Sequence, residues 1–367
     1  MSDPRMQKLA DILVNYSTKV KPGDWVHINA SILAQPLAKE VLSAVLKAGG
    51  YPSLTLASPD LDTQYLAEAN EDQLRWTPPL EMNVIEKADV WIILEAPENT
   101  RSMTNVDPER QQMRNSAYAE WMDIYMKRSA SGDLRWVMTN FPCQALAQDA
   151  EMSLAEYEDF VYAATFADQD DPVGRWQAIR TEQAHLVQWL AGKKEVAIRG
   201  PHVDLTMSIA GRSFINSYGD QNMPSGEIFT SPVEDSVNGW VEFAYPAIYL
   251  GVAVEGVRLE FEKGKVVKAS AKKGEEFLLK MLDSDEGARR LGELGIGTNY
   301  GIQKFTRDIL FDEKIGGTFH LALGNGFPEA GGGNESNIHW DLIADGTNAT
   351  SILVDDEVFY ENGKFTV

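Results

Sequence analysis

Helical and strand-like spacings of apolar residues alternate through the first half of the chain. Apolar side chains recur three or four positions apart over residues 6–16, which predicts a helix, and WVHIN (25–29) predicts a strand after a Lys-Pro-Gly-Asp turn. The alternation continues with a helix over 36–47, strands at PSLTLA (52–57) and VWIIL (90–94), a helix over 108–128 and a strand at RWVMTN (135–140). Strands separated by helices predict a parallel sheet with helices on its faces.

The pattern changes after Gly192. Residues 175–190 predict the last long helix of the first half. Beyond it, short strand candidates are separated by Gly, Pro, Asn and Asp, with one helical piece over 273–291. We therefore expect an α/β protein of two domains, an N-terminal parallel-sheet α/β domain over 1–192 and a β-rich α+β domain over 193–367.

The charge balance limits the classes of partner. The 367 residues include 33 Lys and Arg against 55 Asp and Glu, a formal net charge of -22. This excess repels nucleic-acid phosphates and anionic lipid headgroups, so we expect neither nucleic acid nor a membrane as a partner. No stretch approaches the roughly 18 apolar residues of a membrane-spanning helix, and the first residues lack the pattern of a secretory leader. We therefore expect a cytoplasmic protein.

Candidate metal ligands lie in the glycine-rich C-terminal third. Of the five histidines, His320 follows a Gly-Gly turn and His339 precedes Asp341 by two positions. In an extended segment His339 and Asp341 point to the same face and can share one ligand. Neutral imidazole and carboxylate both suit divalent ions. Spacing alone leaves a second interpretation open, in which each histidine hydrogen-bonds a backbone carbonyl.

Other chemistries have less support in the sequence. Glu227 lies in a Pro/Gly turn and Glu293 at the end of the predicted helix over 273–291, where each alone is typical of a surface residue. The glycine-rich segments match neither a phosphate loop nor a dinucleotide fingerprint, and no GxSxG motif is present. The one cysteine, Cys143, lies in the apolar stretch FPCQALA, which favours a buried structural thiol over a nucleophile.

Four motifs in a fixed order resemble one enzyme family. They are MPSGEIFTSPVEDSVNG (223–239), LGELGIGTN (291–299), LFDEKIGGTFHLALG (310–324) and GGGNESNIHWDLI (331–343). Together they are similar to the metallo-aminopeptidase family that includes aminopeptidases T and S. The resemblance implies an N-terminal α/β domain, a C-terminal catalytic domain that binds two divalent ions, a homodimer, and the removal of N-terminal residues from small peptides.

The resemblance also implies the roles of individual residues. The implied metal ligands are Glu227, Glu293, His320, His339 and Asp341. Three carboxylates and two neutral imidazoles leave two divalent ions, Zn, Co or Mn, with a net charge of about +1, enough to bind a hydroxide and polarise a carbonyl. A carboxylate such as Glu293 could bridge the two ions, although the sequence does not fix which ligand bridges, and Glu293 is also expected to be a catalytic residue together with the general base.

The general base is less defined than the ligands. Glu335 precedes His339 by four residues, which makes it the candidate for proton transfer to and from a metal-bound water. Glu329 and Glu234 are the alternatives, and a surface position is open for all three.

One ligand position departs from the family pattern. The family has a tyrosine ligand seven residues after the first histidine, where this chain has Phe327. Phenylalanine does not coordinate metal, although Tyr300 is another phenol that could replace it. The departure strengthens an alternative function, a non-haem Fe(II) ring-cleaving dioxygenase of the 2,5-dihydroxypyridine type that uses His320, His339 and Asp341. The aminopeptidase stays the first interpretation, because Glu227 and Glu293 are both retained and suit a second metal. A catalytically silent binding protein on the same fold is a third hypothesis.

Overall fold

The computed structural model describes residues 3–367, which divide into two compact units. The first contains the chain up to residue 175 together with residues 219–224, and the second contains residues 176–218 and 225–367. The boundary expected after Gly192 lies at the end of helix α10 (Pro172–Leu190). In the structure most of α10 belongs to the second unit, because Leu186 and Leu190 pack into the hydrophobic core of that unit.

The first unit is built on a five-stranded sheet with the strand order β2-β1-β3-β4-β8. Its strands are β1 (Trp25–Ser31), β2 (Tyr51–Ala57), β3 (Val90–Glu95), β4 (Arg135–Asn140) and β8 (Asn222–Met223). Every neighbouring pair in the sheet is parallel, which confirms the predicted parallel sheet. Residues 219–224 join this unit because β8 pairs with β4.

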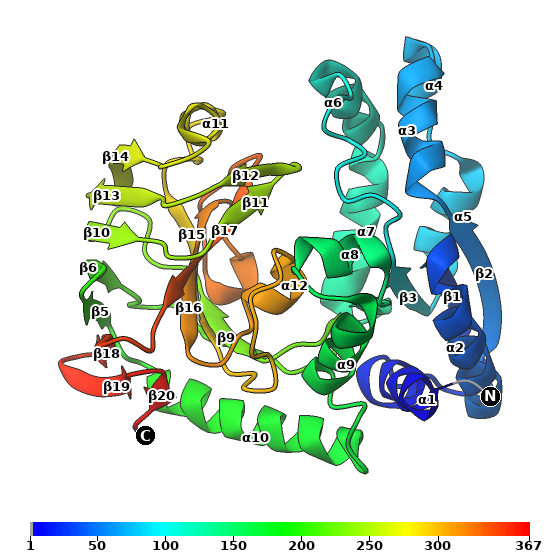
Figure 1. Cartoon of the computed structure of the whole chain (residues 1–367), viewed down its shortest axis with the longest axis horizontal. Helices are drawn as coiled ribbons and strands as arrows, with labels where there is room; N and C mark the ends of the chain where they lie inside the picture. Colours follow the sequence, from blue (N-terminus) through cyan, green and yellow to red (C-terminus); the bar gives the residue numbers. More distant parts are fainter. Residues whose placement is uncertain (1–2) are drawn as a thin grey trace. The chain divides into compact units, whose positions relative to one another are not determined.

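Helices connect the strands of the first unit and are drawn in blue to green (Figure 1). They are α1 (Pro4–Asp11), η1 (Ile12–Ser17), η2 (Ile32–Ala34), α2 (Gln35–Ala48), α3 (Pro59–Glu68), α4 (Glu71–Leu74), α5 (Pro79–Lys87), α6 (Pro108–Ala117), α7 (Ala119–Ser131), α8 (Gln144–Asp149) and α9 (Leu154–Ala164). Helix α2 ends at Gly49, whose φ of 84° is the left-handed conformation that glycine adopts without a steric penalty. The single helix predicted over 108–128 is instead two helices, because the backbone leaves helical geometry at Tyr118.

The second unit contains three antiparallel sheets. Their strand orders are β14-β13-β10-β6-β5-β18-β19-β20, β17-β16-β15-β9-β7 and β11-β12. The strands are β5 (Glu195–Gly200), β6 (Val203–Ser208), β7 (Ile215–Ser217), β9 (Glu227–Thr230), β10 (Asn238–Glu242), β11 (Ala247–Tyr249), β12 (Val252–Val254), β13 (Arg258–Glu262), β14 (Lys265–Ser270), β15 (Leu291–Gly297), β16 (Thr318–Gly324), β17 (His339–Asp345), β18 (Ser351–Val354), β19 (Glu357–Glu361) and β20 (Lys364–Phe365). The predicted β-rich second half is therefore confirmed.

One hydrophobic core joins the two large sheets of the second unit. It includes Leu205 of β6, Leu321 of β16 and Leu342 of β17, none of which is exposed to solvent. Side chains alternate between the two faces of a strand, so the neighbours of Leu321 and Leu342 point away from this core. Every residue of β15 and β16 is nevertheless buried. The second face of the five-stranded sheet is therefore also covered, and any polar group on it lies in a largely dry environment.

The helix predicted over 273–291 is shorter in the structure. Helix α11 covers only Glu275–Leu282, because the chain turns at Asp285, whose carboxylate accepts hydrogen bonds from the backbone N–H groups of Gly287 and Ala288. The expectation that Glu293 lies at a helix end is wrong, since Glu293 is inside strand β15. Within residues 3–367, no helix combines the length and apolar character needed to cross a membrane.

Candidate metal centre

The five predicted ligand side chains come from four neighbouring strands of the five-stranded sheet. Glu227 begins β9, Glu293 lies in β15, His320 lies in β16, and His339 and Asp341 lie in β17. Residues directly opposite each other in an antiparallel pair share a face of the sheet, as do alternate residues of one strand. The observed register therefore places all five on the same face, opposite to that of Leu321 and Leu342.

Small residues on the adjacent strands leave room for these side chains. On one adjacent strand the opposite partner is Gly297 for Glu227, Ala322 for both Glu293 and Asp341, Gly295 for His320, and Gly324 for His339, whereas on its other side His320 is opposite Ile343. The clearest case is Gly295, because a Cβ atom at this position would lie 2.0 Å from Nε2 of His320. The imidazole thus lies over Gly295, and any larger residue there would displace it.

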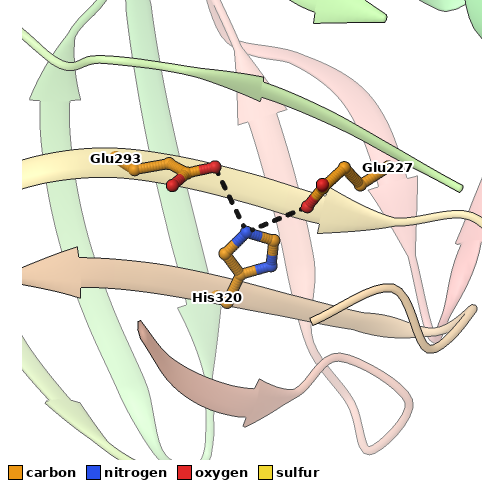
Figure 2. A group of neighbouring side chains, drawn as sticks. All are labelled: Glu227, Glu293 and His320. Carbon is orange, nitrogen blue, oxygen red and sulfur yellow. Dashed lines mark hydrogen bonds and ion pairs between the residues drawn. The ribbon is translucent and has the colours of Figure 1, made fainter. Parts of the chain in front are cut away.

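The first group of ligand atoms surrounds His320 (Figure 2). Nε2 of His320 lies 3.3 Å from Oε2 of Glu227 and 3.4 Å from Oε1 of Glu293. The His320 side chain is fully buried, and both glutamates are nearly so. A buried imidazole nitrogen between two carboxylates is an arrangement that suits a divalent cation.

The second group contains the other oxygen of Glu293. Its Oε2 lies 3.1 Å from Nε2 of His339, which in turn lies 3.7 Å from Oδ2 of Asp341. Glu293 therefore presents one oxygen to each histidine, as a ligand that bridges two ions would. A third group of metal-ligating atoms consists of Glu313, His320 and Asp341, whose atoms lie within 4.8 Å of one another.

Unsatisfied atoms in the cluster show that these residues fit a metal. Among the described residues, Oε2 of Glu227 and Oδ1 of Asp341 are buried without a hydrogen-bond partner. A buried carboxylate oxygen without a partner costs free energy, and a cation would offset that cost. The donor set of carboxylate oxygens and imidazole nitrogens suits Zn, Mn and related divalent ions.

The carboxylates of the cluster have strongly perturbed acidities. Burial raises the pKa of Glu227 to about 8, although Lys314 opposes this effect, and burial likewise raises the pKa of Asp341 to about 6 against the attraction of His339. Burial acts in the same direction on Glu293, but its hydrogen bonds with His320 and His339 outweigh burial and lower its pKa to about 2. Glu293 is therefore the carboxylate that stays ionised.

The pKa values of the two imidazoles are raised, whereas burial alone would lower them. Burial by itself lowers the pKa of an imidazole. For His320 the Glu293 and Glu227 carboxylates outweigh burial and raise the pKa to about 9. For His339 the carboxylates of Asp341 and Glu293 raise it to about 10. The surrounding carboxylates thus favour the protonated, cationic form of both imidazoles, a positive charge that a divalent ion would otherwise supply.

The structure adds two residues that the sequence reasoning missed. Lys314 is fully buried, contacts the carboxylate of Glu313 and lies 3.7 Å from Oε1 of Glu227. Both residues directly follow the short helix α12 (Ile309–Asp312). The consecutive charges of the segment DEK before a Gly-Gly turn were the available signal. Sequence alone does not reveal that the lysine is buried beside a ligand.

The three candidate general bases lie outside the three groups. Glu335 and Glu329 are exposed in the segment between β16 and β17. Glu234 accepts hydrogen bonds from Arg212 at 2.6 Å and from the backbone N–H of Gly333 at 2.7 Å. None of them contributes an atom to the groups of possible metal ligands among the described residues.

The aromatic candidates have different positions. The ring of Phe327 packs edge-on against the imidazole of His339 with 5.1 Å between centroids, which places it beside the second group. The hydroxyl of Tyr300 donates a hydrogen bond to the backbone carbonyl of Gly363 and belongs to none of the groups. Cys143 is buried and donates to the carbonyl of Pro97, in agreement with a structural thiol.

Comparison with known proteins identifies the family. The model of the family described as thermophilic metalloprotease (M29) matches residues 2–365. The chain belongs to the thermophilic metalloprotease (M29) family. Its relatives include aminopeptidase 2 of Geobacillus stearothermophilus, 27% identical over 96% of this chain and 91% of that protein. Aminopeptidase T of Thermus thermophilus is 26% identical over 98% of this chain and 96% of its own length.

A solved structure supports the same fold. The chain is similar to wild-type AmpT from Thermus thermophilus, with a TM-score of 0.86, 24% identity and 99% of both chains covered. These findings confirm the resemblance inferred from the motifs, the fold class, and the expectation of a metal-dependent hydrolase of the M29 aminopeptidase family. The dioxygenase alternative receives no support from the M29 match or from the relatives.

A larger residue opposite His320 should weaken metal binding. In Gly295→Ala the new methyl group would meet the imidazole, so His320 must move away from Glu227 and Glu293. We expect metal affinity to fall by about 10- to 100-fold, the range for residues that orient metal ligands. Isothermal titration with Zn would measure it. Gly333→Ala is the matched control, since its new methyl meets only an ordinary contact at 3.4 Å. Equal affinities would contradict the steric role of Gly295.

The metal-free protein should lose stability as pH rises. The pKa values of His320 and His339 are raised above the usual 6.5, so the stability they contribute is complete below pH 6.5 and is lost as pH rises through 9 to 10. Glu227 also lowers the stability of the folded state as pH rises from 4.5 to 8. Its pKa is raised to about 8, so the folded state keeps a proton that the unfolded state has already released.

Calorimetry of EDTA-treated protein between pH 6.5 and 10 should therefore show a falling Tm. The increase in Tm on adding metal should grow over the same pH range. At higher pH fewer protons have to leave the ligands when metal binds, so metal binds more tightly and stabilises the folded state more. His339→Gln should flatten the metal-free profile. A metal-free Tm that stays constant or rises would show that the cluster is not held by these protons.

Proposed function

We propose that this chain is a dinuclear metallo-aminopeptidase, which removes the N-terminal residue of small peptides through a metal-activated water. The observation that carries the proposal is the position of Glu293 between two imidazoles, with Oε1 near His320 and Oε2 near His339. Membership of the M29 family and the aminopeptidase names of its relatives support the peptide substrate.

The proposed ligands divide into two sets that share one carboxylate. Glu227, Glu293 and His320 would hold one ion, and Glu293, His339 and Asp341 the other. Bound Zn, Co or Mn would supply a Lewis acid that lowers the pKa of a water and polarises the peptide carbonyl. Glu227 would bind through Oε2 alone, because its Oε1 faces the ammonium group of Lys314.

A dinuclear site explains the carboxylates better than a mononuclear iron site does. A dioxygenase built on His320, His339 and Asp341 has no need of further acids. Yet Glu227 and Glu293 both lie within 3.4 Å of His320 and are buried with it. The five residues all belong to the second unit, which supports the proposal that the segment 193–367 forms the catalytic domain.

The substrate, assembly and location complete the proposal. A formal charge of -22 and a carboxylate-rich site favour a substrate with a free, positively charged amine at its N-terminus. We further propose a cytoplasmic homodimer, on the strength of the family resemblance.

A metal-reconstitution assay tests this function. After removal of metal with EDTA, hydrolysis of leucine p-nitroanilide should be absent, and Zn, Co or Mn should restore it at about two ions per chain. Acetyl-leucine p-nitroanilide should remain uncleaved, because acetylation removes the ammonium charge. Oxygen uptake with 2,5-dihydroxypyridine and Fe(II) is the contrasting measurement. Activity that survives EDTA, or oxygen uptake without peptide hydrolysis, would refute the proposal.

Restoring a phenol at residue 327 should strengthen the second metal set. Phe327 packs against His339, so the hydroxyl of Phe327→Tyr would enter the region of His339 and Asp341. We expect tighter binding of the second ion and faster hydrolysis at limiting metal, since a tyrosine there could also donate to a developing oxyanion. Phe327→Leu is the control, because it changes the ring without adding an oxygen. Unchanged metal content and activity in Phe327→Tyr would place residue 327 outside metal-binding reach.

A further inference from the structure

An ion pair lies beside the proposed metal ligands and is not part of the two proposed ligand sets. Lys314 is the only lysine or arginine that is fully buried among residues 3–367. Its ammonium group contacts the carboxylate of Glu313, whose side chain keeps 15% of its surface exposed. Lys314 is therefore buried away from solvent, whereas Glu313 keeps some contact with it.

Glu313 lies beside the ligand cluster without being required in it. One of its oxygens lies within 4.8 Å of ligand atoms of both His320 and Asp341. The two proposed metal sets each contain three protein ligands without it. Glu313 thus lies next to a ligand of each proposed set and is assigned to neither set.

Peptide hydrolysis needs a group that moves a proton between water and the leaving amine. Such a group must be within hydrogen-bond reach of the water, directly or through one solvent molecule. The sequence-based candidates belong to none of the groups of possible metal ligands among the described residues: Glu335 and Glu329 are exposed, and Glu234 is bound to Arg212. Among the described carboxylates, Glu313 adjoins the cluster and is not one of the five ligands.

We propose that Glu313 is the proton-transfer group of the peptidase reaction and that Lys314 is the positioning residue that orients it. This proposal rests on the proposed function. The Glu313 carboxylate takes a proton from the attacking water while the water oxygen forms a bond to the peptide carbonyl carbon. The same proton then passes to the leaving nitrogen as the C–N bond breaks. Glu313 ends as a carboxylate, and one water is consumed for each bond cleaved.

The local structure supports a fixed position for this pair. Helix α12 begins at the cap residue Asp308, and the buried Asp312 accepts hydrogen bonds from both N–H and Oγ1 of Thr306. The backbone carbonyl of Lys314 accepts a hydrogen bond from Asn299. A proton-transfer group held in one geometry avoids reorganisation during reaction.

The proposal is tested by Glu313→Gln, which keeps the shape of the side chain and its contact with Lys314 but accepts no proton. We expect metal content by elemental analysis and the Tm of the metal-loaded protein to match the wild type. We expect kcat for leucine p-nitroanilide to fall by about 100- to 10,000-fold, the usual contribution of general acid–base catalysis, with little change in KM. Glu276→Gln, at an exposed position of α11, is the control and should keep wild-type values.

Two further variants separate a chemical role from a structural one. Glu313→Asp keeps a carboxylate and should recover part of the kcat lost in Glu313→Gln. Lys314→Met should lower kcat while the protein still binds metal, because Glu313 loses the cation that orients it.

Several outcomes would overturn the proposal. Loss of metal from Glu313→Gln would make Glu313 a ligand, and hydrolysis within tenfold of the wild type would remove it from proton transfer. A large kcat loss in Glu335→Gln but not in Glu313→Gln would assign the role to Glu335. A wild-type chain without peptidase activity under any metal would instead refute the proposed function, and this inference with it.

Discussion

The carboxylate of Glu293 faces two imidazoles, and the rest of the candidate metal centre is arranged around that interaction. Its oxygens lie 3.4 Å from His320 and 3.1 Å from His339. This geometry requires that side chains from neighbouring strands share one face without collision, which the small residues opposite each ligand allow. A β-bulge directly before Glu293 adjusts the register there. Sheet register and residue size, rather than a ligand loop, therefore build this site.

Stability and function are coupled because the cluster is buried. Carboxylates and imidazoles placed in a dry sheet interior need either protons or cations between them. The raised pKa values of Glu227, His320 and His339 favour the protonated form of these groups wherever no cation balances the carboxylates. Metal binding replaces those protons, so the free energy of metal binding also contributes to the stability of the second unit.

The one departure from the family pattern lies beside the second group of ligands. Phe327 contributes a ring next to His339 where the family resemblance implies a phenol oxygen. The Glu313–Lys314 pair lies next to Glu227, His320 and Asp341. The five proposed ligands themselves are all present and clustered, and the chain belongs to a metalloprotease family over nearly its whole length.

The sequence by itself determined which residues are candidate metal ligands and which kind of sheet each half forms. Helical spacing between apolar runs predicted the parallel sheet, and the ordered motifs identified Glu227, Glu293 and His320 together with the pair in β17. Only the tertiary structure decided that Glu293 belongs to a strand instead of a helix end, that Glu335 is exposed, and that Lys314 is buried beside Glu313. Periodicity and motif order are local properties that a single chain displays directly. Strand register, burial and the distance between charges depend on contacts between residues far apart in the sequence, and these exist only once the chain has folded.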